Sequence, residues 1–402
     1  MPFWRRSEEP PRHLPLATGP HAVGYQDVMT PGPAEEGQSI FTTGNIFHGS
    51  FLCKFSGVFV RIYYPSEYPQ TDTIKKHSMW PLWSDDDYLI GFVKFMQAML
   101  ARWPSWAPRG EFMFIDQISY IAPLMHLGCT HVWKLLNGRV HCPILKSAPV
   151  SRDKQWPLVV FSHGMGCSRF AYSRICTDIA SHGFIVAATE HRDGSAALSF
   201  TMERGEKIWI NHRRIEDGEK EYSVRNAQLK LRIAEVVRTL NLMEELNKGS
   251  NITNVLEDAK EYKLDLFKNT MDLSKPILTG HSYGGATTMM TLAQEKRFAQ
   301  AVVLDGWLFP MKDECVNPEQ PIMFINTESF MSRQNINRMK EYLTGINRKM
   351  VFIKGSVHQN HIDAPLIFKD GIIKKIIGMQ SDTDPILVLD LNDKLMLHYM
   401  IT

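Results

Sequence analysis

Short apolar runs recur along residues 150–360, and longer segments with helical periodicity separate them. The runs carry few charges, as strands that are buried on both faces do. They lie at residues 158–161, 184–188, 277–279, 301–304, 321–326 and 350–354. Between them, the apolar spacing predicts helices over 172–181, 224–247 and 286–294. Strands that alternate with helices predict an α/β fold, with a mostly parallel central sheet and helices on both faces.

The first part of the chain shows a less regular pattern. Residues 1–40 are rich in proline, glycine and charge, which predicts an extended or disordered arm. β-Branched and aromatic residues at 58–64 predict a leading strand, and the apolar spacing predicts a helix over 86–101. Residues 192–222 are charged, and we expect them to pass over the surface. Because we find no repeat and no later linker, we expect residues 41–402 to form a single domain.

A second apolar stretch, residues 112–136, contains few charges. Two interpretations remain open for it. A helix of this composition can pack on the core, or its apolar face can be exposed for contact with lipid. In the second case, the side chains on the lipid side include Leu124, Trp133 and Leu136.

Composition and charge argue against several classes of protein. Of the 402 residues, 44% are apolar and 22% are charged, which is an ordinary globular composition. The net charge of +2, without long basic runs, argues against nucleic-acid binding. No run approaches the length of about 18 apolar residues that a membrane-spanning helix needs.

Cysteine usage and the beginning of the chain bear on the compartment. The six cysteines are scattered and form no C-x-x-C pair, which favours reduced thiols in a cytosolic protein. Residues 1–15 contain no apolar segment of the kind found in signal peptides, and Pro2 excludes N-myristoylation. We therefore expect a cytoplasmic protein and regard a secreted form as less favoured.

The sequence PILTGHSYGGA at residues 276–286 contains G-x-S-x-G between a predicted strand and a predicted helix. This is the context of a nucleophile elbow, a sharp turn that lifts a serine hydroxyl above the edge of a sheet. Only small residues fit two positions before and after Ser282 in such a turn. At ordinary glycine and serine usage, the bare pattern also arises by chance in about one chain in seven of this length. The rest of the chain must therefore supply a base, a carboxylate and an oxyanion hole.

Two further groups lie at the ends of predicted strands, where a parallel sheet collects its catalytic side chains. Asp305 directly follows the strand at 301–304, and His358 lies in the loop after the strand at 350–354. With Ser282, they follow the order Ser, Asp, His that is typical of the α/β-hydrolase fold. A neutral imidazole takes the proton of the serine, and the carboxylate orients that imidazole. These residues predict a serine hydrolase.

The sequence His163-Gly164-Met165-Gly166 follows another predicted strand and indicates an oxyanion hole. We expect the backbone N–H groups of Met165 and Tyr283 to bind the oxyanion, each contributing about 3–4 kcal/mol. In this interpretation His163 shapes the turn. His361 is a rival to His358 as the base.

No sequence pattern indicates a metal or cofactor site. There is no H-E-x-x-H and no EF-hand loop, and the pair His358-x-x-His361 lacks further ligands. The pair Gly164-x-Gly166 lacks the third glycine of a dinucleotide fingerprint. His191 follows another predicted strand beside charged neighbours, and we interpret it as structural. The predicted activity is hydrolysis that needs neither calcium nor a cofactor.

The stretches around these residues are similar to the platelet-activating factor acetylhydrolases, the plasma-type and type II intracellular phospholipases A2. The resemblance covers most of the chain. Its motifs are PLVVFSHGMG at 157–166, SHGFIVAATEHRDGSA at 181–196, GHSYGGAT at 280–287, LDGWLFP at 304–310 and GSVHQN at 355–360. On this resemblance, the nucleophile, acid and base fall on Ser282, Asp305 and His358. The oxyanion donors fall on Met165 and Tyr283.

The resemblance implies an esterase that removes the sn-2 acetyl, short or oxidised acyl chain of a glycerophosphocholine lipid. The products would be a lyso-phospholipid and a short acid. A general carboxylesterase or transacylase on the same triad remains an alternative, because the sequence does not give the shape of the acyl pocket. An inactive lipid-binding homologue is less favoured, because the chain keeps Ser282, Asp305 and His358.

The resemblance also implies peripheral contact with a membrane or lipoprotein surface through apolar helices. Residues 118–136 correspond to one of these helices, and residues 365–378 correspond to another. In the second, basic residues stand beside an aliphatic face, as in interfacial helices. Its candidate lipid-facing residues are Leu366, Ile367, Phe368 and Ile372. We expect a monomer or a weak dimer. The family usually has phenylalanine where this chain has Tyr283, so we expect a phenol near the acyl pocket.

Overall fold

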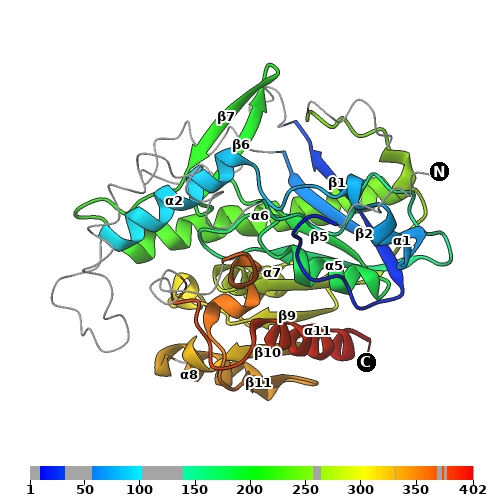
Figure 1. Cartoon of the computed structure of the whole chain (residues 1–402). Helices are drawn as coiled ribbons and strands as arrows, with labels where there is room; N and C mark the ends of the chain where they lie inside the picture. Colours follow the sequence, from blue (N-terminus) through cyan, green and yellow to red (C-terminus); the bar gives the residue numbers. More distant parts are fainter. Residues whose placement is uncertain are drawn as a thin grey trace, which may run out of the picture.

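The computed structural model describes residues 10–31, 57–101, 139–256, 264–330, 332–368, 374 and 378–401. In these residues, nine strands form one mixed sheet (Figure 1). Their order across the sheet is β11 (Lys349–Ile353), β10 (Ile322–Thr327), β9 (Gln300–Leu304), β8 (Met271–His281), β4 (Trp156–Ser162), β5 (Ile185–Thr189), β2 (Phe59–Pro69), β1 (His21–Met29) and β3 (Leu145–Lys146). Neighbouring strands from β11 to β5 are parallel, whereas β2 is antiparallel to both β5 and β1. The predicted fold class is confirmed.

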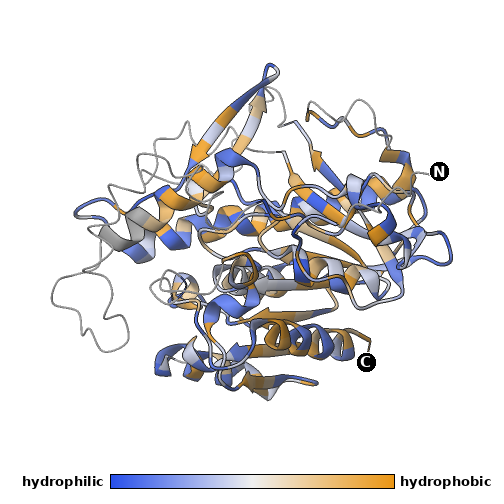
Figure 2. Cartoon of the chain, in the orientation of Figure 1, coloured by the Kyte–Doolittle hydropathy of each residue, from blue (hydrophilic) through white to orange (hydrophobic). Residues whose placement is uncertain are grey.

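Helices cover both faces of the sheet. Their bounds are α1 (Asp72–Lys75), α2 (Asp86–Ala101), α5 (Ser173–Ser181), α6 (Glu221–Lys248), α7 (Tyr283–Gln294), α8 (Arg333–Glu341), α9 (Ala364–Ile367) and α11 (Pro385–Ile401). In β4, Leu158 and Val160 join the core under α6 and α7, whereas Val159 and Phe161 join the core under α5 and α11. Successive side chains of a strand point to opposite faces, so a strand between two helical layers must be apolar throughout. Figure 2 shows this apolar centre in orange.

The structure corrects the prediction of an extended arm over residues 1–40. Residues 21–29 form β1, which pairs along its length with β2 inside the sheet. Its side chains Ala22, Val23 and Val28 are buried. The proline and glycine content that suggested an arm was averaged over the whole segment, and it concealed the apolar positions of one strand.

A second correction concerns residues 192–222. Residues 192–200 are buried, and they lead into a hairpin of β6 (Leu198–Glu203) and β7 (Glu206–Asn211). Only the later part of the predicted surface excursion is largely exposed, including the tip of the hairpin, which projects at the top of Figure 1. The charges near residue 192 are compatible with burial because they are hydrogen-bonded: the guanidinium of Arg192 donates to the backbone carbonyl of Gly57, and Asp193 accepts the backbone N–H of Ser195 at 3.0 Å.

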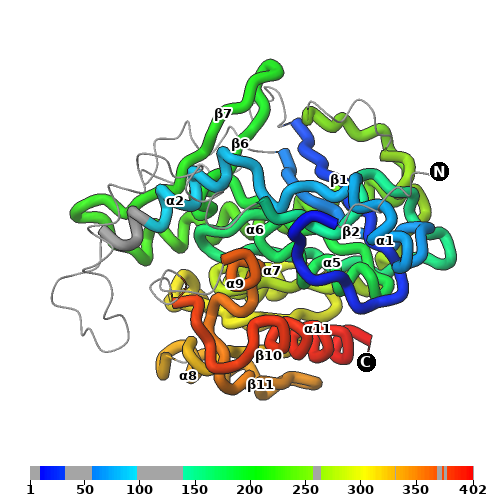
Figure 3. Tube along the Cα trace, in the orientation of Figure 1, coloured from blue at the N-terminus to red at the C-terminus, as the bar shows by residue number. Residues whose placement is uncertain are grey.

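The predicted helix over residues 365–378 is described only at its beginning. Helix α9 ends at Ile367, and residues 369–373 and 375–377 lie outside the described residues. In Figure 3, the orange tube that follows β11 runs back from the edge of the sheet toward α7. Among the described residues, no helix combines the length and the apolar character needed to cross a membrane.

Candidate active site

Ser282 occupies a sharp turn between β8 and α7. Its backbone has φ of 56° and ψ of −114°, a conformation that a residue with a side chain rarely adopts. The Ser282 N–H donates to the carbonyl of Leu304 at 2.9 Å, which anchors the turn to β9. A Cβ atom added at Gly284 would lie 2.0 Å from the carbonyl oxygen of Ser162, and one at Gly280 would lie 2.2 Å from that of Gly284. The chain therefore needs glycine on both sides of the serine.

Asp305 follows β9, the strand beside the elbow, and its carboxylate is fully buried. It accepts hydrogen bonds from the backbone N–H of Thr327 at 2.6 Å, from the Thr327 hydroxyl, and from Nδ1 of His358 at 3.0 Å. Burial alone would raise the pKa of Asp305. The electrostatic interaction with His361 and the hydrogen bond with His358 outweigh burial and hold this pKa far below its usual range. Asp305 is therefore a permanent anion at neutral pH.

His358 begins a short 3-10 helix, η7 (His358–His361), in the loop after β11. Its imidazole stacks on Phe330 with ring centroids 3.8 Å apart, and it lies 4.4 Å from the ring of His281, the neighbour of Ser282. Its side chain is 21% exposed. The loop thus brings an accessible imidazole, already bonded to a carboxylate, to the elbow.

His361, the rival base, lies on the inner side of the same turn. Its Nε2 is 3.4 Å from the carboxylate of Asp305, its Nδ1 is 3.0 Å from the side-chain amide of Asn392, and none of its side chain is exposed. A buried imidazole held in this way is poorly placed to exchange protons with substrate or water. The geometry therefore favours His358 as the base.

Three groups of the site could also serve as metal ligands. Donor atoms of His281, Asp305 and His358 lie within 4.8 Å of one another. The Asp305 carboxylate already receives donors from Thr327 and His358, and Nδ1 of His281 pairs with the hydroxyl of Tyr172 at 2.7 Å. A metal ion would have to displace these hydrogen bonds. Burial, together with His358 and His361, lowers the pKa of His281 far below its usual value, so this imidazole is neutral.

The turn at 163–166 has two of its N–H groups occupied. The Gly164 N–H donates to the hydroxyl of Tyr172 at 2.9 Å, and the Gly166 N–H donates to the carbonyl of Ser195 at 2.8 Å. Within the described residues, the N–H of Met165 has no such partner. The N–H of Tyr283 is also free of an intrahelical bond, because Tyr283 is the first residue of α7. These are the two N–H groups for which the sequence analysis predicts a role as oxyanion donors.

The two histidines near this turn, His163 and His191, make hydrogen bonds that support the fold. The Nε2 of His163 accepts the backbone N–H of His191 at 3.0 Å. His191 lies between Glu235 and Ser162, each at 2.8 Å from one of its ring nitrogens. Burial lowers the pKa of both imidazoles far below the usual value. Neither histidine is part of the Asp305 pair.

Sequence comparison places this geometry in a known family. Residues 97–401 match the family model described as platelet-activating factor acetylhydrolase, isoform II. The platelet-activating factor acetylhydrolase of Bos taurus is 35% identical over 395 residues, covering 96% of this chain and 76% of the relative. That of Gallus gallus is 32% identical, covering 94% of this chain and 80% of the relative. The chain belongs to the platelet-activating factor acetylhydrolase family.

The structural comparison agrees with this assignment at the level of fold. A ferulic acid esterase from Streptomyces cinnamoneus superposes with a TM-score of 0.56, covering 96% of this chain and 90% of the esterase. The two chains are 16% identical, so this likeness concerns the fold alone. The expectation of an α/β-hydrolase fold and the family resemblance stated from the motifs are both confirmed.

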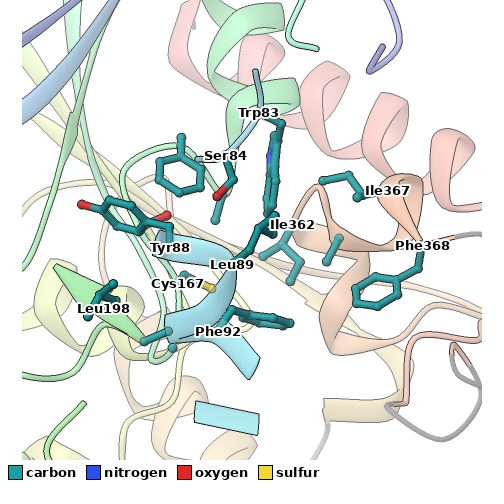
Figure 4. A pocket seen from close by; sticks show the side chains of 16 residues that line it. Trp83, Ser84, Tyr88, Leu89, Phe92, Cys167, Leu198, Ile362, Ile367 and Phe368 are labelled. Carbon is teal, nitrogen blue, oxygen red and sulfur yellow. The ribbon is translucent and has the colours of Figure 1, made fainter. Parts of the chain in front are cut away.

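A pocket of this family member opens beside the turn at 163–166. Its volume is about 550 Å³, part of which is open to solvent. Figure 4 shows its walls, which combine α2 and the two residues Trp83 and Ser84 before it, the segment 166–171, the start of β6, and the segment from Ile362 to Phe368. Most of the lining side chains are apolar, and they include Trp83, Tyr88, Leu89, Phe92, Phe170, Leu198, Ile362, Ile367 and Phe368. The pocket therefore adjoins the turn that carries Met165, whereas Ser282, Asp305 and His358 are not among its lining residues.

The lipid-surface residues predicted from the sequence have different outcomes. Leu124, Trp133, Leu136 and Ile372 lie outside the described residues. Leu366 is half-buried against the core under α5 and α11. The remaining two, Ile367 and Phe368, are 2% and 9% exposed and line the pocket, so they do not form an exposed face in this structure.

The phenol of Tyr283 also differs from its prediction. The Tyr283 side chain is fully buried, and its hydroxyl donates to the backbone carbonyl of Arg225 in α6. Tyr283 is not among the residues that line the pocket. The side chain instead packs against α6, where it contacts Arg225 and Arg232.

Several supporting residues carry no sequence signal. Thr327 holds the carboxylate of Asp305, and Tyr172 joins the turn to His281. Asp363 accepts the backbone N–H groups of Ser173 and Arg174, and also the indole N–H of Trp83 at 2.8 Å. Burial raises the pKa of Asp363 to about 7, although these donors favour its charged form. No catalytic motif assigns a role to these residues, because most of their partners lie far away in the sequence.

Proposed function

We propose that the protein is a calcium-independent serine esterase that removes the sn-2 acetyl or short acyl group of glycerophosphocholine lipids. The names of its relatives support the substrate class, since they are described as platelet-activating factor acetylhydrolases. The observation that carries the proposal is the Asp305–His358 pair, which meets the Ser282 elbow beside an apolar pocket.

In the proposed mechanism, His358 acts first as a base. Its Nδ1–H donates to Asp305, which leaves Nε2 free to take the proton of the Ser282 hydroxyl. The serine oxygen attacks the ester carbonyl, and the N–H groups of Met165 and Tyr283 bind the resulting oxyanion.

The next two steps complete the cycle. The tetrahedral intermediate collapses to an acyl-enzyme when His358 returns the proton to the leaving glycerol oxygen, which releases the lyso-lipid. Water then attacks the acyl-enzyme, again with His358 as base, and releases the short acid. All charge changes take place on the substrate, on the imidazole and beside the two N–H donors, so the sequence of steps needs no metal ion.

The pocket favours a lipid substrate over a polar ester. Its apolar lining matches an alkyl or short acyl chain and offers no charged group for a headgroup. We therefore place a hydrocarbon chain in the pocket and the phosphocholine toward solvent. The same proposal includes peripheral docking on a membrane or lipoprotein surface. It also includes a cytoplasmic location and a monomeric or weakly dimeric state.

Release of acetate from 1-alkyl-2-acetyl-glycerophosphocholine, with a chelator present, tests this function. We expect the wild-type protein to release acetate, and Ser282→Ala to release none while keeping its melting temperature. A panel of short p-nitrophenyl esters serves as the comparison substrate. Turnover of those esters without release of acetate from the lipid would favour a general carboxylesterase. Turnover by Ser282→Ala would contradict the serine mechanism.

A further inference from the structure

Arg232 of α6 lies between the two halves of the proposed oxyanion hole. None of its surface is exposed, and it is among the largest fully buried side chains of the described residues. A buried guanidinium is costly unless its N–H groups find partners. Serine esterase chemistry does not itself need a buried arginine. The contacts of this side chain therefore indicate its role.

On one side, Arg232 holds the turn that carries Met165. One terminal nitrogen donates to the backbone carbonyl of His163 and lies 3.4 Å from the hydroxyl of Ser162. The other terminal nitrogen donates to the hydroxyl of Ser195, whose carbonyl accepts the N–H of Gly166. Arg232 is thus connected to the chain both before and after Met165.

On the other side, Arg232 holds Tyr283. Its guanidinium carbon lies 4.5 Å from the centre of the Tyr283 ring, within the range of a cation–π contact. Its Nε donates to the hydroxyl of Thr287 at 3.0 Å, and that hydroxyl donates to the carbonyl of Tyr283 at 3.0 Å. The same side chain therefore restrains the first turn of α7, where the second N–H donor lies.

The hydrogen bonds that Arg232 makes in the described residues go to neutral acceptors. The nearest link to a carboxylate is indirect, because the hydroxyl of Ser195 donates to Asp193 at 2.6 Å. An arginine that served only to form a salt bridge would have a carboxylate in direct contact with its guanidinium. Instead, the planar fork of the arginine connects two pieces of backbone that have no covalent connection near the site.

From these contacts we propose that Arg232 is a positioning residue, which holds the N–H groups of Met165 and Tyr283 at the separation that a tetrahedral oxyanion requires. The proposal rests on the proposed hydrolase function. Oxyanion donors act only when they are aimed in advance at the place where the charge develops. A small displacement of either donor weakens binding of the transition state and leaves binding of the ground state nearly unchanged.

The test compares Arg232→Lys with wild type on p-nitrophenyl acetate. Lysine keeps the charge but cannot bridge His163 and Thr287 at once. We expect kcat to fall by about 10²-fold with KM within about threefold. The inhibition constant of an alkyl trifluoromethyl ketone, which forms an oxyanion on Ser282, should rise by the same factor as kcat/KM falls.

Arg174→Lys is the matched control. Arg174 is also almost fully buried, but its guanidinium pairs with Asp178 of its own helix and with Asp390 and Asp393 of α11, and it makes no hydrogen bond to the turn at 163–166 or to Tyr283 among the described residues. We expect this variant to lower the melting temperature without a change in kcat or in the affinity for the ketone. If the role of Arg232 were purely structural, Arg232→Lys would likewise lower the melting temperature without a change in kcat or in the affinity for the ketone.

Ser195→Ala provides a second test if Arg232→Lys does not fold. It removes one acceptor of the guanidinium and keeps the carbonyl that holds Gly166. We expect kcat to fall by about three- to tenfold, with a matching loss of affinity for the ketone. A loss of stability with unchanged kcat, or a rise in KM that accounts for the whole effect, would overturn the proposal.

The same assay separates the two proposals. If Ser282→Ala keeps full turnover of p-nitrophenyl acetate, the proposed hydrolase function fails, and the inference fails with it. If turnover depends on Ser282 but is the same in the folded Arg232→Lys and Ser195→Ala variants, only the inference about Arg232 is wrong.

Discussion

Two regions meet at the turn of residues 163–166, and different forces hold each of them together. The region with Ser282, Asp305 and Tyr283 is held by hydrogen bonds between buried polar groups. The pocket region, between α2 and α9, is held mainly by apolar contact. Hydrogen bonds depend on direction and fix the positions of atoms, whereas apolar contacts tolerate changes of shape. Changes in the first region should therefore alter the rate, and changes in the second should alter the choice of acyl chain.

The largest effect expected in the polar region comes from His358. We expect His358→Gln to lower kcat by about 10⁶-fold, because no other accessible imidazole can take the proton of Ser282. In contrast, His361→Gln should lower kcat by less than about tenfold, since it weakens only a supporting interaction with Asp305. Steady-state rates on p-nitrophenyl acetate, with melting temperatures, check both variants. The reverse order of effects would reassign the base to His361.

Asp305→Asn should have the next largest effect on rate. We expect a loss of about 10⁴-fold in kcat, because an amide cannot hold the imidazole in the tautomer that leaves Nε2 free. The substitution is nearly isosteric, so circular dichroism should show an intact fold. Near-wild-type turnover in Asp305→Asn would show that another group orients His358.

The same variant tests the electrostatics of Asp305. Its native pKa lies far below that of an unfolded aspartate, so the ionised carboxylate stabilises the folded state. This contribution is fully present above about pH 4 and is lost as the pH falls from there toward the native pKa. We expect the difference in unfolding free energy between wild type and Asp305→Asn to be constant from about pH 7 to pH 5 and to shrink by about pH 3. Urea unfolding at these values measures it, and a difference that grows in acid would contradict the assignment.

The smallest effect on chemistry is expected in the apolar region. Phe92→Ala enlarges the pocket, so we expect kcat/KM for the sn-2 acetyl lipid to fall by about five- to tenfold, the value of a lost apolar contact. Turnover of p-nitrophenyl acetate, which brings no alkyl chain to the pocket, should stay within about twofold, and lipids with a longer sn-2 acyl chain should lose less than the acetyl lipid. The control is Phe352→Ala, which removes a 44%-exposed ring on β11, away from the pocket. Equal losses on all esters would show that Phe92 contributes to the chemical step and not to the choice of substrate.

The proposed catalytic groups were accessible to sequence reasoning because each lies directly after a strand or in the loop that follows one. Ser282, Asp305 and His358 follow β8, β9 and β11, and the parallel arrangement of these strands brings their carboxyl ends to one edge. The helix over 86–101 was also predicted with its bounds, because its apolar positions repeat at helical spacing. The role of that helix was not predicted. In the structure, Tyr88, Leu89 and Phe92 of this helix form a wall of the pocket.

Other parts could not be predicted because their meaning depends on partners far along the chain. Residues 192–200 look like a solvent-exposed segment, but Glu235 and Gln228 of α6 supply the hydrogen bonds that permit their burial. Ile367 and Phe368 have the composition of a lipid-facing helix, but both turn inward. Phe368 packs with Ala364 and Met379, and Ile367 joins the core under α5 and α11. Apolar side chains carry no information about which apolar surface they will meet.

Local sequence was sufficient for the strand–helix alternation, the strained elbow and the order of the three reactive residues, because these depend on backbone preferences and on neighbours a few positions away. Only the folded chain shows that Thr327 holds Asp305 and that Arg232 links the turn at His163 to Tyr283. Hydrogen bonds between distant segments form after the sheet has assembled, and a single sequence does not record which buried donor will meet which acceptor. The reaction type therefore follows from short motifs, whereas the precision of the site depends on tertiary contacts.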